Sequence, residues 1–551
     1  MRVLGINAVF HDPSAALVVD GRIVAAAEEE RFSRRKHGKR PVPFSAWELP
    51  ERAAAWCLTR AGLTPADVDA VAYSFDPGLC RPADSLGLRD PWDWLRQDYA
   101  RRAPEFLATA LPGLDPAAVR FVPHHVAHAA SAALALPPDA TGRDCAVLVL
   151  DGRGEVHSHL AGRYRGGELE VLAGQELPHS LGLLYEDLTE HLGFLRSSDE
   201  YKVMAMASYG EPRFLGELRE RVRATPEGGF AVEPVDFGTF AKRLAAGEDW
   251  TADHADLTAS VQRRLEEVLV ELARWTYDAA GGPTTLAMAG GVALNCVANS
   301  RIAAETPFDR VWVQPAAGDA GTALGAALAV SADLGELAAP MPGADLGRDF
   351  TDDEIETVLR TAKVPYSRPA SIAAEAAEVL AADGIVAWFQ GRSEYGPRAL
   401  GHRSLLAHPG RAENLERIND VKGREQFRPV APMVLAERAA EIFTGPLPSD
   451  YMLFVHEVAA GWRDRIPAVV HVDGTARIQT VHADREPLVA ELLRSFEART
   501  GLPTVVNTSL NTAGRPMVDD PRDALELFGS APVDLLAIGP FAVRRSAFSA
   551  S

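Results

Sequence analysis

The sequence predicts an α/β protein built from two domains. Short apolar runs typical of β-strands alternate with helical patterns along most of the chain. The chain has 551 residues, several times the roughly 100–200 residues of one domain, so more than one folding unit is expected. Residues 339–352 are rich in Pro, Gly and Asp, which is typical of a linker. We therefore predict an N-terminal domain over residues 1–338 and a C-terminal domain over residues 353–551.

Apolar runs separated by short turns predict the strands of the N-terminal domain. Residues 2–8, 14–20 and 22–28 predict three successive strands joined by Asp-containing turns. Residues 145–176 repeat this plan, with an apolar strand that ends at Asp151 and two returning strands. The repeat predicts two similar halves around a cleft.

Helices and further strands are expected between and after these repeats. A helix is expected over residues 51–61, a strand over 70–75 and an amphipathic helical stretch over 92–111. Residues 284–300 and 310–328 predict two strand-to-helix crossings. Both crossings turn through small residues at the carboxyl end of a strand, where open α/β sheets bind ligands.

The C-terminal domain mixes the same two kinds of element. Residues 384–390, 504–510 and 534–539 predict strands, and helices are expected near 373–382 and 486–499. No low-complexity tract or short-period repeat interrupts the pattern. The domain is therefore expected to fold as an α/β unit of its own.

Composition and charge disfavour several classes of protein. The formal net charge is −20, which argues against a nucleic-acid partner and against an anionic membrane surface, because both bind basic proteins. No apolar run reaches the ~18–20 residues of a membrane-spanning helix, and the first ten residues have the pattern of a strand rather than of a signal peptide. The cysteines stand apart, without a C-x-x-C pair, at Cys57, Cys80, Cys145 and Cys296. A reducing cytoplasm is therefore the expected location.

Basic side chains gather between Glu394 and Pro432, in a stretch punctuated by Gly and Pro. They are Arg398, Arg403, Lys422, Arg424 and Arg428. Their spacing is too irregular for one solvated helix face, and the turns G-P-R and F-R-P fix the backbone. Guanidinium groups match the oxygens of phosphate and carboxylate, so we expect a preformed oxyanion pocket here rather than a salt-bridged surface.

Two histidines and two aspartates predict a metal site. His124 and His128 are four residues apart, and a helix that begins near the preceding proline would place both imidazoles on one face. His125 would point elsewhere, which favours a structural role. Asp151 ends an apolar strand, and Asp319 lies in a turn of small residues. With open positions such a set suits Fe, Mn, Zn or Mg beside a nucleotide phosphate, although either aspartate alone is also compatible with a turn-stabilising cap.

Two turns of the N-terminal domain predict contacts with a nucleotide or with a reacting proton. Gly290 and Gly291 precede an expected helix, with Asn295 in its first turns, so a phosphate could approach the helix N-terminus. His11 and Asp12 lie in the first hairpin turn, where they suit proton transfer or phosphate contact. Both turns also have explanations that need no function. The glycine pair is compatible with ordinary strand–helix packing, and His11 and Asp12 are compatible with a simple Asp-Pro turn.

Further polar groups extend these candidates. Lys36 belongs to the basic run of residues 30–40 and would reach a phosphate if that loop folds over the cleft. Glu200 and Lys202 form a charged pair within an apolar stretch, which is costly unless it lines a site. Short polar groups that alternate on one side after a strand of the C-terminal domain fit a nucleotide or a carbamoyl amide. They are Asn507, Ser509 and Asn511.

Ten motifs stand out along the chain. In chain order they read FHDPSAAL, EEERFSRRKH, HHVAHAAS, DGRGE, DEYKVMAMASYG, AGGVALN, GDAGTALG, GPRALGHRS, KGREQFRP and NTSLNTAGRPMV. Taken together, they resemble one enzyme family, the NodU/CmcH-type O-carbamoyltransferases of nodulation-factor and antibiotic biosynthesis. They span nearly the whole chain, and GPRALGHRS and KGREQFRP are the most specific. The run after GHRS departs from the family pattern, because it reads AHPG with His408 where the family often has Asp.

The resemblance implies a fold and a reaction. The N-terminal domain would be sugar-kinase/actin-like and related to threonylcarbamoyl-transfer proteins, and the C-terminal domain would be YrdC-like. Carbamoyl phosphate and ATP would give carbamoyl-adenylate in the C-terminal domain, with release of phosphate and pyrophosphate. An acceptor hydroxyl would then take the carbamoyl group in the N-terminal domain as AMP leaves. The implied cofactors are ATP and a divalent metal, with Fe²⁺ as the family precedent and Mg²⁺ or Mn²⁺ as alternatives.

The resemblance also assigns roles by motif. The implied metal ligands are His124, His128, Asp151 and Asp319. The implied carbamoyl-phosphate contacts are Arg398, Lys422 and Arg428, with Asn507, Ser509 and Asn511 beside them. The residues near the transfer site would be His11 and Lys36, and those that hold the nucleotide would be Gly290, Gly291 and Asn295. His11 is the candidate for the base that takes the proton of the acceptor hydroxyl.

The implied partners are carbamoyl phosphate and a hydroxylated natural product, with a macrolide or a glycosylated metabolite favoured, and the protein would be a monomer or a homodimer.

Two related enzymes compete with this prediction. A tRNA threonylcarbamoyl transferase is disfavoured by the net charge of −20 and by the fused C-terminal domain, and a hydrogenase-maturation enzyme by the absence of zinc-ribbon cysteine pairs. A non-catalytic nucleotide-binding scaffold of the same fold is the alternative from another class.

Overall fold

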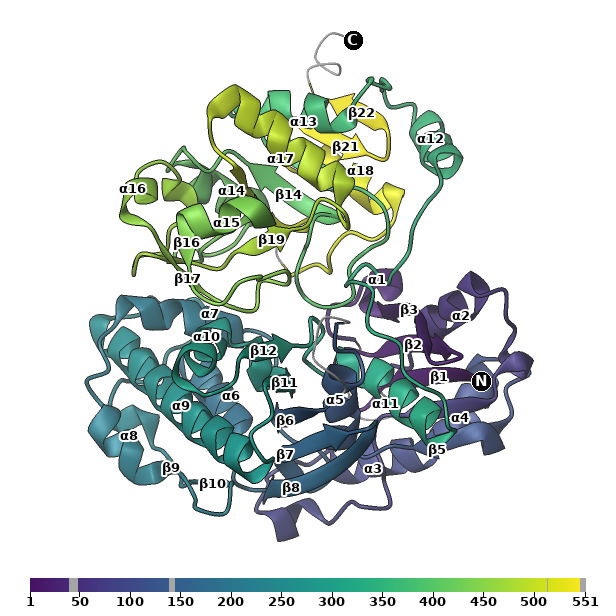
Figure 1. The fold of residues 1–551 in the computed structure, drawn as a ribbon, viewed down its shortest axis with the longest axis vertical. Helices are drawn as coiled ribbons and strands as arrows, with labels where there is room; N and C mark the ends of the chain where they lie inside the picture. Colours follow the sequence, from purple (N-terminus) through teal and green to yellow (C-terminus); the bar gives the residue numbers. More distant parts are fainter. Residues whose placement is uncertain (39–47, 138–143, 513, 546–551) are drawn as a thin grey trace. The chain divides into compact units, whose positions relative to one another are not determined.

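The computed structural model describes residues 1–38, 48–137, 144–512 and 514–545. The chain forms two compact α/β units, Met1–Gly343 and Ala344–Ser551, coloured purple to teal and green to yellow in Figure 1. The boundary falls inside the linker-like segment 339–352. Among the described residues, no helix combines the length and the apolar character needed to cross a bilayer.

The N-terminal unit begins with a five-stranded sheet in the order β3-β2-β1-β4-β5. Its strands are β1 (Arg2–Asn7), β2 (Ser14–Val19), β3 (Arg22–Glu28), β4 (Ala70–Tyr73) and β5 (Val119–Phe121). The first three strands pair in an antiparallel manner, whereas β4 and β5 run parallel to β1. The apolar runs predicted as three successive strands are therefore confirmed as strands.

A second sheet of the same unit repeats this topology in the order β8-β7-β6-β11-β12. Its strands are β6 (Cys145–Leu150), β7 (His157–Arg165), β8 (Glu168–Glu176), β11 (Thr285–Ala289) and β12 (Arg310–Val313). Again three strands pair in an antiparallel manner and two run parallel to the first of them. The repeated plan predicted from the sequence is confirmed at the level of sheet topology.

Two central helices connect the sheets, α5 (His124–Ala133) and α11 (Ala320–Asp333). Helix α11 packs on β1 and β2, α5 packs on β6 and β11, and the two helices pack against each other, as Figure 1 shows. Their approach requires glycine: a Cβ at Gly325 of α11 would stand 1.8 Å from the carbonyl oxygen of Ala127 in α5. The close packing places the ends of these helices beside the ends of strands from both sheets.

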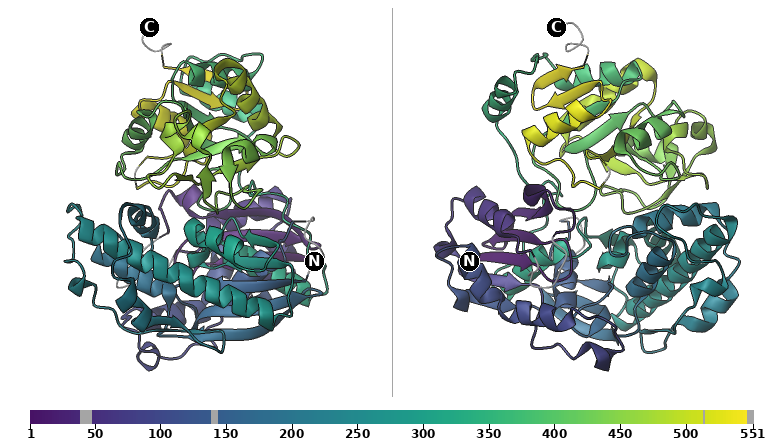
Figure 2. Two further views of the ribbon diagram at one scale, coloured as in Figure 1. Left: turned by 60° about the vertical axis from the view of Figure 1, so that its left-hand side comes forward. Right: turned by 180° about the vertical axis from the view of Figure 1, so that it is seen from behind.

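The other helices of this unit lie in the connections. The first half contains α1 (Glu30–Ser33), α2 (Glu51–Arg60), α3 (Asp93–Arg101) and α4 (Ala103–Ala110). The second half contains α6 (Leu181–His191), α7 (Glu200–Met206), α8 (Leu215–Arg221), α9 (Ala252–Ala279) and α10 (Cys296–Glu305), of which α9 is the long teal helix in Figure 2. The stretch 92–111, expected as one amphipathic segment, forms two helices, because Pro104 stands in the first turn of α4.

The C-terminal unit contains a mixed seven-stranded sheet in the order β19-β15-β20-β14-β13-β21-β22. Its strands are β13 (Val386–Phe389), β14 (Arg403–Ala407), β15 (Ala431–Leu435), β19 (Gln479–Val481), β20 (Thr504–Ser509), β21 (Leu535–Ile538) and β22 (Phe541–Arg544). The three strands predicted from the sequence of this domain, β13, β20 and β21, are confirmed. A small sheet joins β16 (Phe443–Thr444), β17 (His456–Val458) and β18 (Thr475–Ala476).

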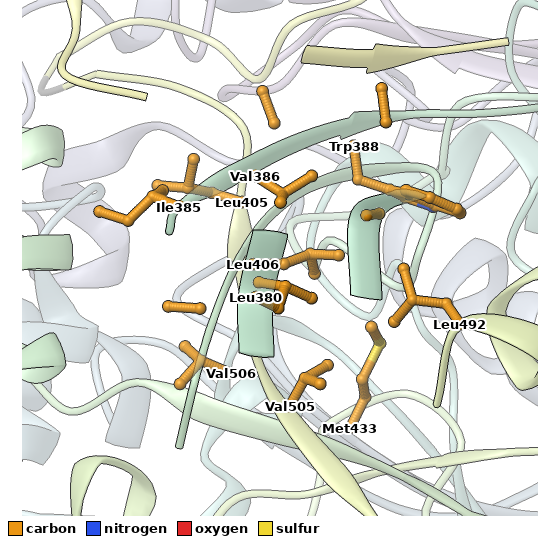
Figure 3. Packing of buried hydrophobic residues seen from close by; sticks show 14 of the residues in the cluster. Leu380, Ile385, Val386, Trp388, Leu405, Leu406, Met433, Leu492, Val505 and Val506 are labelled. Atoms are coloured by element: carbon orange, nitrogen blue, oxygen red, sulfur yellow. The ribbon is translucent and has the colours of Figure 1, made fainter. Parts of the chain in front are cut away.

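Helices α13 (Ile372–Ala381) and α17 (Pro487–Thr500) pack together on this unit's core, as the sequence predicts within one residue at each end. Figure 3 shows the core, in which Trp388 of β13 lies among aliphatic side chains of the neighbouring strands and of both helices. Trp388 is fully buried, and its indole N–H donates to the carbonyl of Gly401 at 2.8 Å. The remaining helices are α12 (Asp352–Thr361), α14 (Asn414–Lys422), α15 (Ala436–Ile442), α16 (Ala460–Arg463) and α18 (Pro521–Ser530).

Candidate active site

Two histidines and two aspartates meet in the interior of the N-terminal unit. Helix α5 begins at His124, directly after a proline, so the imidazoles of His124 and His128 lie one turn apart on the same face. Asp151 directly follows β6, and Asp319 directly precedes α11. One ligand atom of each residue lies within 4.8 Å of the others, and all four residues are buried. The structure thus brings the four residues of the predicted metal site together, and we call them the His–Asp cluster.

The His–Asp cluster has the donor atoms of a metal site. His124 Nε2 lies 3.4 Å from Asp151 Oδ2 and 3.6 Å from Asp319 Oδ1, and His128 Nε2 lies 3.9 and 3.7 Å from the same two oxygens. These separations are too long for good hydrogen bonds. In the described part of the chain, Nε2 of both histidines and Oδ2 of Asp319 are buried without a hydrogen-bond partner. Two imidazole nitrogens and two carboxylates that face one point fit a divalent cation.

The tautomer of His124 and the charges of the two carboxylates also favour a metal site. Nδ1 of His124 lies 3.2 Å from the carbonyl oxygen of Ser74, which places its proton there and leaves Nε2 as the metal-binding atom. Burial opposes protonation of His124, but Asp151 and Asp319 outweigh it and raise its pKa well above the ordinary value. Burial and the charge of Asp319 raise the pKa of Asp151, but His124 and His128 outweigh them and leave it at about 2. The carboxylates therefore stay ionised and attract a positive charge.

Two further residues hold the His–Asp cluster in place. Glu155 accepts the backbone N–H groups of His124 and Asp76 with one oxygen, Oε1, at 2.8 Å each, and so fixes the start of α5. Gly291 donates its backbone N–H to Oδ1 of Asp151 at 2.8 Å. Sequence reasoning does not identify Glu155 as a supporting residue, and the only signal is its place in the motif DGRGE.

The predicted nucleotide contacts lie beside Asp151. Gly290 has a φ of +93°, and a Cβ there would stand 2.1 Å from the carbonyl oxygen of Leu150. Asn295 precedes α10 as its N-cap, with its side chain accepting from the N–H of Ala298; the expectation that it lies inside the first turns is wrong. Its amide also exchanges two hydrogen bonds with Gln262, at 2.9 and 3.1 Å. Asn295 thus anchors α10 to α9.

His11 stands next to the His–Asp cluster. Its Nε2 lies 3.8 Å from Oδ2 of Asp319, and its Nδ1 lies 2.9 Å from Oδ2 of Asp12. The other oxygen of Asp12 lies 2.8 Å from Nδ1 of His37, whose Nε2 lies 3.0 Å from Oγ of Ser198. Although burial opposes it, the carboxylates of Asp319 and Asp12 raise the pKa of His11 well above its ordinary value. Sequence reasoning assigns no role to His37 or Ser198, and the only signal for His37 is its place at the end of the motif EEERFSRRKH.

The remaining candidates of this unit are less enclosed. Lys36 is half-buried next to His37, and its amine makes no hydrogen bond or ion pair with any described residue. The end of its basic run, at residues 39 and 40, lies outside the described residues. The Lys202 amine lies 3.1 Å from a carboxylate oxygen of Asp199, and Oε1 of Glu200 accepts the backbone N–H of Ser197 at 2.7 Å. Burial raises the pKa of Glu200 to about 7.

In the C-terminal unit, Lys422 lies at the end of β20. It is the last residue of α14 and is 4% exposed. Its Nζ donates to the carbonyl oxygen and hydroxyl of Ser509 at 2.5 and 3.0 Å, and to the carbonyl and side-chain oxygens of Asn511 at 3.1 and 2.6 Å. The structure therefore brings three predicted residues of this site together around one ammonium group.

The other predicted residues lie on β20 or on segments that contact β20 or α14. Asn507 is buried on β20, two residues before Ser509, and donates to the carbonyl of Ala399, which directly follows half-buried Arg398. Arg428 lies between α14 and β15, and its carbonyl accepts from Asn419 of α14 at 3.1 Å. Its guanidinium lies 3.3 Å from Glu425. Arg398 thus belongs to a turn that contacts β20, and Arg428 to a loop that contacts α14.

Two of the five basic residues use their guanidinium groups for structural contacts and do not line an open oxyanion pocket. Arg403 is fully buried and donates to several backbone carbonyls, including those of Gln390 and Asp519. Its guanidinium also stacks 3.7 Å from the ring centroid of Phe389. Arg424 donates to Oδ1 of Asn419 at 2.6 Å. The expectation of one pocket formed by all five residues is wrong for Arg403, because tertiary contacts use its donors.

Comparison with known proteins identifies relatives over the whole chain. Residues 2–82 and 95–328 match the family model "Carbamoyltransferase N-terminus", and residues 377–545 match "Carbamoyltransferase C-terminus". An uncharacterized protein of Synechocystis is 35% identical over 99% of this chain and 97% of its own length. The nodulation protein NolNO of Sinorhizobium fredii is 36% identical over 98% of this chain and 80% of its own. Among solved structures, HypF of T. kodakarensis is 14% identical with a TM-score of 0.31, over 61% of this chain and 49% of its own.

Proposed function

The chain belongs to the carbamoyltransferase family, and from this premise we propose that it is an ATP-dependent O-carbamoyltransferase. In the C-terminal unit, carbamoyl phosphate and one water give carbamate and phosphate, and a carbamate oxygen displaces pyrophosphate from ATP to form carbamoyl-adenylate. In the N-terminal unit, a hydroxyl of the acceptor attacks the carbamoyl carbon, and AMP leaves. The observation that carries the proposal is the His–Asp cluster, with its buried nitrogen and oxygen atoms that lack partners among the described residues.

The His–Asp cluster would hold the divalent cation of the transfer step. His124 and His128 would bind it through Nε2, and Asp151 and Asp319 through one carboxylate oxygen each. The bound cation supplies positive charge that offsets the negative charge of the leaving AMP and of the two carboxylates. Iron is our first choice of metal and Mg²⁺ or Mn²⁺ the alternatives, since imidazole with carboxylate suits iron and manganese.

His11 would accept the proton of the acceptor hydroxyl. Its Nδ1–H can donate to Asp12, which leaves Nε2 as an acceptor that faces Asp319. Once the charge of Asp319 is neutralised, the main interaction that raises the pKa of His11 is removed, and a neutral imidazole can act as a base. Lys36, on the neighbouring loop, would contact the nucleotide phosphate.

The basic residues of the C-terminal unit would bind carbamoyl phosphate. Lys422 supplies a buried ammonium group at the end of β20, and Arg398 and Arg428 supply guanidinium groups on adjacent turns. Cationic groups held by a rigid backbone bind a phosphate and stabilise the charge that develops as it leaves. The phosphate would thus sit beside Ser509 and Asn511.

The acceptor is proposed as a hydroxylated natural product, with a macrolide or a glycosylated metabolite preferred. The net charge of −20 disfavours a nucleic acid as the acceptor. Incubation with a panel of such metabolites, ATP and carbamoyl phosphate should give one product with the added mass of a carbamoyl group. Modification of a tRNA instead would contradict this choice of acceptor.

The decisive experiment omits the acceptor. The purified protein with ATP and carbamoyl phosphate should release pyrophosphate and phosphate, and Arg428→Ala should lose this release while it keeps the fold. The variant His128→Asn, altered only in the N-terminal unit, is the matched control and should retain the release. If the wild-type protein releases no pyrophosphate with or without acceptor, it is a scaffold and not the proposed enzyme.

A further inference from the structure

Glu394 carries a buried oxygen atom without a donor. Its Oε1 accepts the backbone N–H groups of Leu400, His402 and Arg403 at 2.7, 3.0 and 3.2 Å. Its Oε2 is buried and has no hydrogen-bond partner among the described residues, although Glu394 as a whole is only 1% exposed. Buried polar atoms are nearly always paired in folded proteins, so an exception calls for an ordered water, an ion or a ligand as its partner.

Asn507 carries a second such oxygen. Its Nδ2 donates to the carbonyl of Ala399 at 3.0 Å and to Oε1 of Gln479 at 2.8 Å. The orientation of Gln479 is set because its Nε2 donates to the carbonyl of Leu400 at 2.7 Å. The orientation of the Asn507 amide follows from these contacts. Its Oδ1 is therefore an acceptor, and it is buried without a partner in the described part of the chain.

The two oxygens belong to one local structure. The contacts of Glu394 and Asn507 meet at adjacent residues, Leu400 and Ala399, in the turn that contains Arg398. Asn507 also shares a face of β20 with Ser509, about 7 Å along the strand. The hydroxyl of Ser509 accepts a hydrogen bond from the Lys422 ammonium group. Both acceptors thus belong to residues that contact the Arg398 turn, and one of them lies on the strand whose end contacts Lys422.

We propose that Oε2 of Glu394 and Oδ1 of Asn507 bind the amino group of carbamoyl phosphate and so select it over other acyl phosphates. The inference rests on the proposed function and names the part of the substrate that these residues recognise. Phosphate and carbonyl oxygens are acceptors only, whereas the amino group brings two N–H donors for the two acceptors. Acetyl phosphate has a methyl group in that place and leaves both oxygens unpaired.

An amino group on a planar carbon also occurs in ATP, as the 6-amino group of adenine. We favour the carbamoyl amino group, because Asn507 lies two residues before Ser509, whose hydroxyl accepts from Lys422. A site built to hydrogen-bond an N–H can reject an analogue that lacks it by up to about 10⁴–10⁵. Analogues of carbamoyl phosphate and of ATP, each without its amino group, show which of the two amino groups these oxygens bind.

The test uses Glu394→Gln in the full-length protein. The glutamine oxygen can keep the three backbone N–H bonds, while its amino group replaces the unpaired oxygen and turns an acceptor into a donor. Glu486→Gln is the matched control, because Glu486 lies 3.2 Å from His402 in the same region but contacts neither unpaired oxygen. Asn507→Ser is a second variant that removes the other acceptor.

Pyrophosphate release is measured with carbamoyl phosphate against acetyl phosphate, and with ATP against purine riboside triphosphate, which lacks the 6-amino group. Thermal shifts with carbamoyl phosphate alone report binding without turnover. We expect Glu394→Gln and Asn507→Ser to reduce the preference for carbamoyl phosphate at least about tenfold, with Glu486→Gln unchanged.

The outcomes distinguish the inference from the proposed function. If Glu394→Gln and Asn507→Ser fold and keep the full preference for carbamoyl phosphate, the inference is overturned while the proposed function stands. If they lose the preference for ATP over the purine analogue instead, the two oxygens bind adenine and the inference is also overturned. If the wild-type protein neither binds nor consumes carbamoyl phosphate, the proposed function itself fails.

Discussion

The backbone N–H of Gly291 donates to Oδ1 of Asp151 at 2.8 Å. A glycine that the sequence assigns to nucleotide binding therefore fixes a carboxylate of the His–Asp cluster. A Cβ on Gly291 would stand 3.0 Å from the same oxygen, so a side chain here would crowd the contact.

Gly291→Ala should weaken metal binding. The added methyl group would push on Oδ1 of Asp151, and residues that orient metal ligands typically contribute about 10–100-fold to affinity. Metal content after dialysis against a metal buffer measures the effect. Gly318→Ala is the control, since its Cβ would meet only Leu294, at 3.7 Å; equal metal loss in both variants would contradict the role of the contact.

His128→Asn should lose the metal, whereas His125→Asn should retain it. His128 faces both aspartates of the cluster, while His125 is buried elsewhere on α5, near Gly154. Removing one of four ligands should reduce affinity by at least about 100-fold, more than a change in the outer contacts does. Elemental analysis of both purified variants tests this expectation, and metal retained by His128→Asn would exclude the site.

His11→Asn should separate the two half-reactions. Asparagine cannot accept the proton of the acceptor hydroxyl, so carbamoylation of the acceptor should fall by about 10²–10⁴-fold. Pyrophosphate release from ATP and carbamoyl phosphate should continue at the wild-type rate, because the proposed function assigns it to the other unit. Product formation and pyrophosphate are measured in the same reaction. An unchanged transfer rate would show that His11 is not the base.

Arg403→Lys should destabilise the C-terminal unit without a specific effect on substrate binding. The guanidinium group is fully buried and donates to several backbone carbonyls that one ammonium group cannot reach. Loss of these charge-assisted hydrogen bonds should lower the free energy of unfolding by about 2–4 kcal/mol. Denaturant titration measures it. Arg428→Lys is the comparison, with a small change in stability and a higher KM for carbamoyl phosphate; the reverse pattern would contradict both assignments.

The stability of the C-terminal unit should fall at alkaline pH because of His402. Burial lowers the pKa of His402, but Glu486, Glu394 and Asp345 outweigh it and raise the pKa from 6.5 to about 9. A raised histidine pKa stabilises the fold fully below pH 6.5, and the contribution disappears as the pH rises through about 9. Its size should be about 1–3 kcal/mol.

Unfolding by denaturant at about pH 6 and about pH 9.5 compares the wild-type protein with His402→Gln. The wild-type protein should lose more free energy of unfolding than the variant between these two conditions. Equal losses would show that His402 does not carry the pH dependence.

Local patterns were enough to predict much of the fold and part of the site. The apolar runs and their turns predict the repeated sheet plan, because strand spacing is encoded within a few residues. The four-residue spacing of His124 and His128 predicts a shared face, and the strand end at Asp151 predicts its presentation to the interior. These are properties of single elements, and the structure brings them together.

Contacts between distant segments could not be predicted in this way. No local sequence pattern distinguishes Arg403, which donates to backbone carbonyls, from Lys422, which donates to Ser509 at the end of β20. Glu155 and His37 take part in the N-terminal site through contacts with residues far away in the sequence. The unpaired oxygen of Glu394 likewise becomes visible only when all neighbouring donors are placed.

The His–Asp cluster draws its members from α5, from the end of β6 and from the start of α11. Asp319 follows His124 by 195 residues in the sequence. A growing chain on the ribosome therefore lacks the full set of ligands until most of the N-terminal unit has been synthesised and both sheets have assembled. Loading of the ion would thus come late in biogenesis, and a retained ion would report that the whole unit has matured.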